Sequence, residues 1–306
     1  MNIFFVFSAI IILIVIVYYI LENKTFVQKG PVKFLGLGAI FKNEGHILKE
    51  WIEHYKDEEV DHIYLVNDHS TDDYFEILEP YINEGYVTLY HVPNDLEKQQ
   101  RWAVSNIFQK HADEYEWFMH LDLDEFMTSR DAYTVRRKLK EYFSNYNCIF
   151  VPWLMFGSNG LEKHPKSSIQ SYTRRMKFQN HPELENFDNI NGKSIYRKHK
   201  MNIHHPSKEI PIYLNFAYSN LELKVTHFDP ILDYSEESLK EYHLVINHYR
   251  LQSKEFWQTK IKRGDSNGFG DYQNRCLQKF ELLDKYYNEI EDVNLRNKTI
   301  KRRGLS

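Results

Sequence analysis

The sequence predicts an α/β fold in which a mostly parallel sheet carries helices on both faces. Apolar segments of strand length alternate four times with amphipathic segments of helical length, and the connections between them are short. Strands in such repeats lie parallel and are joined by right-handed crossovers. Polar loops follow three of the predicted strands, and sheets of this kind bind ligands beyond the carboxyl ends of their strands. The sequence therefore predicts a binding crevice at that edge of the sheet.

The first half of the chain contains the regular alternation. Residues 33–41 are apolar, include Gly36 and Gly38, and predict a buried strand, and residues 44–55 follow with apolar side chains at helical spacing. Further strands are predicted at residues 62–66, 86–92 and 116–121, and further helices through residues 75–78 and at residues 96–111.

The second half follows a looser pattern. A polar segment at residues 179–191 predicts a loop over the site. The remaining predictions are helices at residues 132–143, 253–262 and 271–290 and short strands at residues 148–155, 169–178, 193–197 and 221–228.

The composition is that of an ordinary globular protein. Of 306 residues 42% are hydrophobic, and the formal net charge is −4, so there is no basic excess to suggest binding to nucleic acid. Lys301, Arg302 and Arg303 form only a small basic tail. Two cysteines exclude a disulfide framework and are compatible with a reducing compartment.

Residues 3–21 are almost wholly apolar and, as a helix, would span about 30 Å of hydrocarbon. No Lys or Arg precedes this run and no small-residue cleavage site follows it, which favours a membrane anchor over a cleaved signal peptide. We therefore expect a single-pass anchor at residues 1–22 and a short stem at residues 23–32. Lys24, Lys29 and Lys33 follow the run, so the positive-inside tendency favours a cytoplasmic location for the remaining chain, with the Golgi or endoplasmic reticulum lumen as the alternative.

Two aspartates end the fourth predicted strand. Asp122 and Asp124 follow an apolar run directly, and Glu125 lies behind them. Carboxylates are costly to bury unless a cation compensates them. Residues i and i+2 of a strand face the same side, and paired carboxylates suit Mg²⁺ or Mn²⁺, which keep open positions for water and substrate phosphates. The sequence therefore predicts a metal site here, with a solvated acidic loop as the alternative.

Five blocks of residues in a fixed order resemble glycosyltransferase family 2-like and family 92 enzymes. The blocks are Lys42, Asn43 and Glu44 with Glu50 and Trp51; Asp68, Ser70 and Asp72; Asp122, Asp124, Glu125 and Phe126; Trp153 with Phe156, Gly157, Ser158, Asn159 and Gly160; and His248, Tyr249 and Arg250 with Ser253, Glu255, Phe256, Lys260, Arg263 and Gly264. The resemblance implies a GT-A fold at residues 33–270, a nucleotide-sugar donor, a divalent metal ion and inversion at the anomeric carbon. Residues 271–306 would add a C-terminal helix and the basic tail.

The resemblance also implies donor-site roles. Asp122 and Asp124 would hold Mn²⁺ or Mg²⁺, which neutralises the diphosphate leaving group. His248 is similar to the late histidine that completes many such sites, and His204 or His205 is the alternative. Asp68 would accept a hydrogen bond from uracil or ribose, although Asp68, Ser70 and Thr71 are also good helix caps. The remaining donor-site candidates are Asn43, Glu44, Ser70 and Arg101.

The acceptor side is less defined. Inversion needs a general base, and the candidates are Glu185, Asp188 and Asp265. Trp153 and Phe156, beside Gly157, would form an apolar platform for a sugar ring, with burial of Trp153 as the alternative. The cations that would stabilise the diphosphate are Lys193, Arg250, Lys260 and Arg263.

These residues favour a hexosyltransferase that moves a sugar from a UDP-sugar to a hydroxyl of a glycan or glycoconjugate. A sugar nucleotidyltransferase is disfavoured because Lys42, Asn43 and Glu44 follow the first strand where a Gly-rich loop with a basic residue is expected. A catalytically inactive, membrane-tethered glycan-binding or scaffold protein is the other alternative, and it has no evident use for Asp122 and Asp124.

Overall fold

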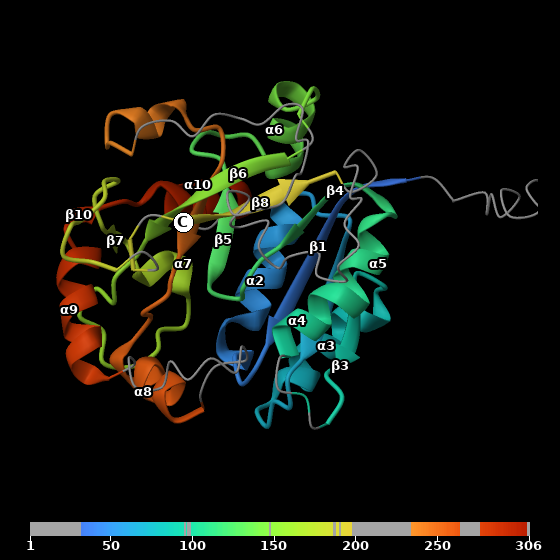
Figure 1. Ribbon diagram of the computed structural model, residues 1–306, viewed down its shortest axis with the longest axis horizontal. Helices are drawn as coiled ribbons and strands as arrows, with labels where there is room; N and C mark the ends of the chain where they lie inside the picture. Colours follow the sequence, from blue (N-terminus) through green and yellow to red (C-terminus); the bar gives the residue numbers. More distant parts are fainter. Residues whose placement is uncertain are drawn as a thin grey trace, which may run out of the picture. The chain divides into compact units, whose positions relative to one another are not determined.

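A mixed sheet flanked by helices is the framework of the computed structural model (Figure 1). The structure describes residues 32–94, 96, 99–146, 148–185, 188–189, 191–197, 234–263 and 276–304. The anchor predicted at residues 3–21 lies outside these ranges, as does the strand predicted at residues 221–228. Within the described ranges, no helix is both long enough and apolar enough to cross a bilayer.

The described part of the sheet has the strand order β3-β2-β1-β4-β8-β6-β9-β5. Four parallel strands form one side, in chain order β1 (Lys33–Phe41), β2 (His62–Asn67), β3 (Val87–His91) and β4 (Tyr115–His120). The other side consists of β5 (Glu125–Thr128), β6 (Cys148–Met155), β8 (Gly192–Tyr196) and β9 (Val245–His248). Among the described strands only β5 and β8 run against the common direction, which confirms a mostly parallel sheet.

The sheet curls along β6. Cys148 to Pro152 of this strand pair with β8, whereas Trp153 to Met155 pair with β9. Pro152 therefore lies where β6 changes partners. The change brings β9 and its partner β5 round toward the carboxyl end of β4.

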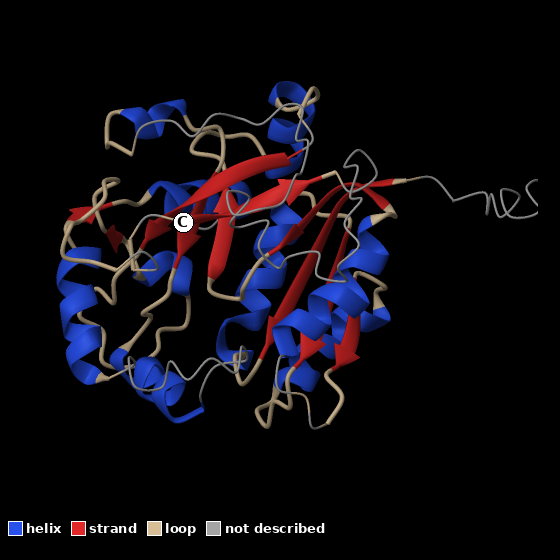
Figure 2. Cartoon of the chain, in the orientation of Figure 1, coloured by secondary structure: helices blue, strands red, loops and turns tan. Residues whose placement is uncertain are grey.

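The helices of the first half cover both faces of the parallel strands (Figure 2). One face of β1 packs against α2 (Gly45–Asp57) and α3 (Tyr74–Asn83) through Leu35, Leu37 and Ala39. The other face meets the helical run formed by α4 (Gln99–Ala103), the π-helical turn η1 (Val104–Phe108) and α5 (Gln109–Ala112). Gly38 allows this approach, because a Cβ there would lie 2.5 Å from the Phe108 ring.

The described residues of the second half add further helices and a two-stranded ribbon. The helices are α6 (Val135–Tyr142), α7 (Ser168–Ser171), the 3₁₀ turn η4 (Ser238–Glu241), α8 (Lys254–Arg263), α9 (Leu277–Tyr287) and α10 (Asn294–Arg303). The ribbon pairs β7 (Arg174–Arg175) with β10 (Ile290–Glu291).

The strand predicted at residues 169–178 is wrong. Residues 168–171 form the helical turn α7, and only Arg174 and Arg175 are extended in β7. The Ser167 side chain accepts from the backbone N–H of Gln170, and Glu50 accepts from that of Ser168 at 2.7 Å. These side-chain caps satisfy the first N–H groups of a helix and so favour the turn over a strand.

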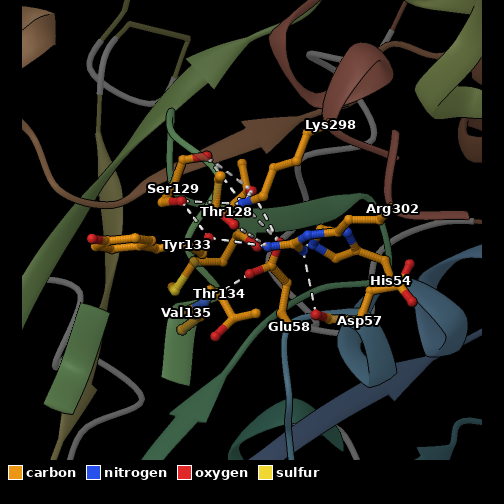
Figure 3. A network of polar contacts seen from close by, with 12 residues as sticks. His54, Asp57, Glu58, Thr128, Ser129, Tyr133, Thr134, Val135, Lys298 and Arg302 are labelled. Atoms are coloured by element: carbon orange, nitrogen blue, oxygen red, sulfur yellow. Dashed lines mark hydrogen bonds and ion pairs between the residues drawn. The ribbon is translucent and has the colours of Figure 1, made fainter. Parts of the chain in front are cut away.

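The C-terminal helix α10 is fixed to the rest of the described body by a buried cluster, the Glu58 network (Figure 3). Lys298 and Arg302 of α10 approach the Glu58 carboxylate to 3.0 and 2.7 Å, and Glu58 is fully buried at the end of α2. The same carboxylate accepts from Thr128 Oγ1 and from the backbone N–H of Val135. Arg302, read from the sequence as part of a basic tail, is thus paired with an acid.

Candidate active site

The acidic turn between β4 and β5 lies at the carboxyl edge of the parallel strands. Leu121 donates its N–H to the carbonyl of Gly38 at 3.0 Å, and the N–H of Glu125 closes the turn on the carbonyl of Asp122 at 3.1 Å. Leu121 and Leu123 are buried in the main core. The two aspartates alternate with these leucines, as the sequence predicts.

Asp122 forms an ion pair with Lys193, which stands near the start of β8. Lys193 Nζ lies 3.0 Å from Asp122 Oδ2 and 3.5 Å from Glu125 Oε2. The Asp122 side chain is 39% exposed, but those of Lys193 and Glu125 are buried. Antiparallel pairing of β4 with β8 explains the contact, because it sets the start of β8 beside the end of β4.

Asp124 is enclosed by residues that come much later in the sequence. Lys260 of α8 donates from Nζ to Asp124 Oδ2 at 2.8 Å and to the carbonyl of Arg250 at 2.9 Å. His248 lies opposite Glu125 in the β5–β9 ladder, and its Nε2 is 3.5 Å from Asp124 Oδ1. The Asp124 side chain is 10% exposed.

Burial and charge give the three acids of the turn different acidities. Burial raises the pKa of Glu125 well above its usual range. Burial acts in the same direction on Asp124, but Lys260 and His248 more than offset it and hold the pKa well below its usual range. The pKa of Asp122 is also lowered, because Lys193 outweighs burial. Burial lowers the pKa of His248 despite the neighbouring Asp124, which favours the neutral imidazole that metals bind.

Of the predicted sugar platform, only Trp153 reaches the turn. Its ring lies 4.6 Å from that of His248, centroid to centroid, and the residue is half-buried. Phe156 is 1% exposed and packs against Tyr249 in the core. Gly157 contacts Asn288, whose side-chain atoms would lie within 2.6 Å of a Cβ at this position. The structure therefore does not bring Phe156 and Gly157 to a sugar-binding surface.

The loops after β1 and β2 are joined to each other. Asn43 donates its N–H to Ser70 Oγ at 2.9 Å, and its side-chain oxygen accepts from the N–H of Thr71 at 2.7 Å. Asn43 and His69 have φ angles of 51° and 54°, which non-glycine residues rarely adopt. Ser70 and Thr71 thus bond between loops, and the residue that precedes α3 is Asp73.

Asp68 is a fully buried acid of these loops. Its side chain is 1% exposed, and its carboxylate lies 3.0 Å from His69 Nδ1 and 3.6 Å from Lys42 Nζ. The strand that precedes Asp68 and the strand that precedes Asp122 flank β1 on opposite sides. The two acids therefore lie at the same edge of the sheet, about two strand spacings, or ~10 Å, apart across it. Glu44 is buried beside the same loops, and Arg101 is half-buried in α4.

The general-base candidates differ in accessibility. Asp188 is 2% exposed, and its two carboxylate oxygens pair with Arg250, at 2.5 Å, and with Lys279. The Glu185 side chain is 74% exposed and 3.4 Å from Lys279. Asp265, His204 and His205 lie outside the described residues, and Arg263 is the last residue of α8. Arg250, predicted as a cation for the diphosphate, thus pairs with Asp188, which was predicted as a general base.

Sequence reasoning did not assign the role of the residues that support the acidic turn, although Trp51 belongs to one of the five blocks. Trp51 of α2 donates its indole N–H to the carbonyls of Asp122 and Glu125, at 3.1 and 3.0 Å. The Tyr55 hydroxyl donates to the carbonyl of Glu125 and accepts from the N–H of Met127, both at 2.9 Å. The sequence contained one signal for this role: Trp51 and Tyr55 lie four residues apart on an apolar helix face. A buried indole N–H or phenol hydroxyl needs a hydrogen-bond partner.

Comparison with known proteins identifies one family. The model of a family described as glycosyltransferase family 92 matches residues 38–281. A curated glycosyltransferase family 92 protein of Ricinus communis is 22% identical over 241 residues, which are 77% of this chain and 39% of the relative. The chain therefore spans less than half the length of this relative.

Solved structures match more weakly. A Staphylococcus aureus TarS structure (residues 1–349) is 15% identical, with a TM-score of 0.33 and coverage of 54% of this chain and 47% of that one. HddC from Yersinia pseudotuberculosis is 10% identical, with a TM-score of 0.35 and coverage of 65% and 90%. Likeness at this level supports no inference about this chain.

Proposed function

The chain belongs to glycosyltransferase family 92, and we propose that it transfers a sugar from a nucleotide-sugar, of which a UDP-sugar is the first choice, to a hydroxyl of a glycan or glycoconjugate. We further propose that the fold is GT-A, that the reaction inverts the anomeric carbon, and that it requires Mn²⁺ or Mg²⁺. The observation that carries this proposal is the acidic turn, which lies at the carboxyl edge of the parallel strands within the matched residues.

The spacing of two side chains at the turn supports a divalent ion there. Among the described residues no three His, Cys, Asp or Glu side chains already converge as ligands. However, Asp124 Oδ1 and His248 Nε2 are 3.5 Å apart, close to the ~3 Å that separates adjacent ligands of a six-coordinate ion with bonds of about 2.1 Å. Asp122 adds a second carboxylate with access to solvent. Asp122, Asp124 and His248 would therefore hold the ion.

The bound ion would supply positive charge against the diphosphate leaving group. Lys193 and Lys260 add two ammonium groups at the same place, each within 3.0 Å of an aspartate. Positive charge fixed in advance stabilises the charge that develops as the sugar leaves. Trp153 offers the half-buried aromatic face beside His248 on which a sugar ring can stack.

Asp68 remains the proposed contact to the ribose or base. Its burial at the same edge as Asp122 supports this role, and Lys42 and His69 keep its carboxylate oriented. The base that removes the acceptor proton is not Asp188 in this proposal, because both of its oxygens are ion-paired. Glu185 and Asp265 remain the candidates.

Release of UDP from a panel of UDP-sugars by the purified chain, with Mn²⁺ or with a chelator, tests the proposal. We expect Mn²⁺-stimulated turnover of one donor, and a loss on the order of 100-fold in Asp124→Asn. Asp131→Asn is the matched control, because Asp131 lies beyond the other end of β5 with its side chain 51% exposed. Equal turnover in Asp124→Asn and in the control would refute the role of the turn, and no turnover of any donor would favour the inactive scaffold.

A further inference from the structure

Each aspartate of the acidic turn is already paired with a buried lysine. Lys193 is 3% exposed and Lys260 is 6% exposed, and they come from β8 and α8. Their sequence distances from Asp122 and Asp124 are 71 and 136 residues. These are therefore contacts built by the fold, unlike the flexible ion pairs of a protein surface.

The two ion pairs carry no net charge between them. Lys193 binds Asp122 Oδ2 at 3.0 Å and Lys260 binds Asp124 Oδ2 at 2.8 Å, so one oxygen of each aspartate already has a positive neighbour. A divalent ion placed there alone would meet two fixed positive charges at short range, in surroundings that screen charge poorly. The same ion accompanied by the diphosphate of a nucleotide-sugar would add no net charge, because the two negative charges of that diphosphate balance it, and the further ionised diphosphate of UDP balances it more than fully.

We propose that Lys193 and Lys260 act as internal counter-ions that keep metal affinity low until a nucleoside diphosphate is bound. The lysines then turn their ammonium groups from the aspartates to the diphosphate, which frees Asp122 and Asp124 as ligands. This inference rests on the proposed function, since it concerns the same metal and donor. It adds that the affinities for the two ligands are coupled and names the two side chains that couple them.

Titration of Mn²⁺ binding by the electron spin resonance of the free ion, with and without saturating UDP, measures this coupling without any turnover. For the wild type we expect weak binding of Mn²⁺ alone and an affinity at least about tenfold higher with UDP. Lys193→Met should bind Mn²⁺ alone at least about tenfold more tightly than the wild type, so that the effect of UDP shrinks. Lys193 is the first target because Asp122, the nearer of its two carboxylate partners, is 39% exposed and stays solvated when the lysine is removed.

Lys138→Met is the matched control. Lys138 is also buried, at 4% exposure, and pairs with Asp131 at 2.6 Å beyond the other end of β5. Its removal changes the net charge of the chain equally, so it should leave Mn²⁺ affinity unchanged. Lys193→Arg should behave like the wild type, because it keeps the positive charge.

The possible failures are distinguishable. If UDP raises the Mn²⁺ affinity of the wild type but folded Lys193→Met binds Mn²⁺ alone no more tightly than Lys138→Met, the counter-ion inference is wrong and the proposed function stands. A wild type that binds Mn²⁺ equally well with and without UDP also overturns the inference, whatever the variants do. If the wild type binds no Mn²⁺ even with UDP, the proposed metal-dependent function fails as well.

Discussion

Asp122 and Asp124 differ in how they meet solvent. The Asp122 side chain is 39% exposed and faces one lysine, whereas Asp124 is 10% exposed and lies between Lys260 and His248. If both held an ion, solvent would reach that ion from the side of Asp122, because Asp124 is buried. We call this the open side. The phosphates of a donor would approach from the open side.

The buried His54 makes the folded state less stable at acidic pH. His54 is 2% exposed, its Nε2 lies 2.8 Å from the carbonyl of Met127, and burial lowers its pKa to about 4. The unfolded chain takes up this proton near pH 6.5 and the folded chain only near pH 4. Between these values the folded state binds fewer protons, so stability falls as the pH decreases through this window.

We therefore expect His54→Gln to lose less stability than the wild type on acidification. Of the free energy of unfolding that the wild type loses between pH 7 and pH 5, about 2 kcal/mol should be absent in the variant. Urea denaturation at several pH values measures this, and His91→Gln is the control because His91 is exposed. Parallel stability curves for His54→Gln and the wild type would contradict the assignment.

At the scale of elements, α2 is the support of the acidic turn. Trp51, His54, Tyr55 and Glu58 lie three or four residues apart on one face, and each bonds to the segment between Asp122 and Thr128. The turn is thus fixed by a buried helix, which suits a site whose carboxylates must keep their positions.

Tyr55→Phe should weaken this support. The substitution removes one hydrogen bond to the carbonyl of Glu125 and leaves the buried N–H of Met127 without its hydroxyl partner, which should cost about 1–3 kcal/mol of unfolding free energy. Tyr142→Phe, on a ring that is 44% exposed, should change stability by no more than about 0.5 kcal/mol. Chemical denaturation compares the two, and equal stabilities would show that α2 does not hold the turn through Tyr55.

The Glu58 network supports the other end of β5. Glu58→Gln leaves the buried Lys298 and the half-buried Arg302 without their compensating charge, and we expect a loss of about 3 kcal/mol. The adjacent Asp57 pairs with Arg303 where both side chains are 29% exposed, so Asp57→Asn should cost at most about 1 kcal/mol. Thermal or urea unfolding that ranks the two variants equally would contradict a stabilising role for the buried cluster.

At the scale of the whole molecule, the predictable part of the fold is the part built from local patterns. β1 and β6 match their predicted bounds, because a continuous apolar run of eight residues indicates a buried strand by itself. The strands β5 and β9, with four residues each, were not predicted. They form a strand pair that joins Glu125 to His248, which are far apart in the sequence, and no local pattern contains such a contact.

The candidate site divides in the same way. Asp122 and Asp124 could be predicted because they follow a buried strand directly, and Asp68 because it follows the strand on the other side of β1. The placement of Lys193 and Lys260 depends on β8 and α8 reaching the turn from distant parts of the chain. Sequence reasoning identified both lysines as cations for a diphosphate, but it could not predict that each forms an ion pair with an aspartate of the turn.

The central claim is that the acidic turn binds a metal ion together with a nucleoside diphosphate. Its most direct test is the melting temperature of the purified chain with UDP and Mn²⁺, separately and combined, because a ligand that binds the folded state raises stability by mass action. We predict a rise with the combination that exceeds the sum of the separate effects and is absent in Asp124→Asn but kept in Asp131→Asn. No rise with the combination, or an equal rise in Asp124→Asn, would contradict the claim.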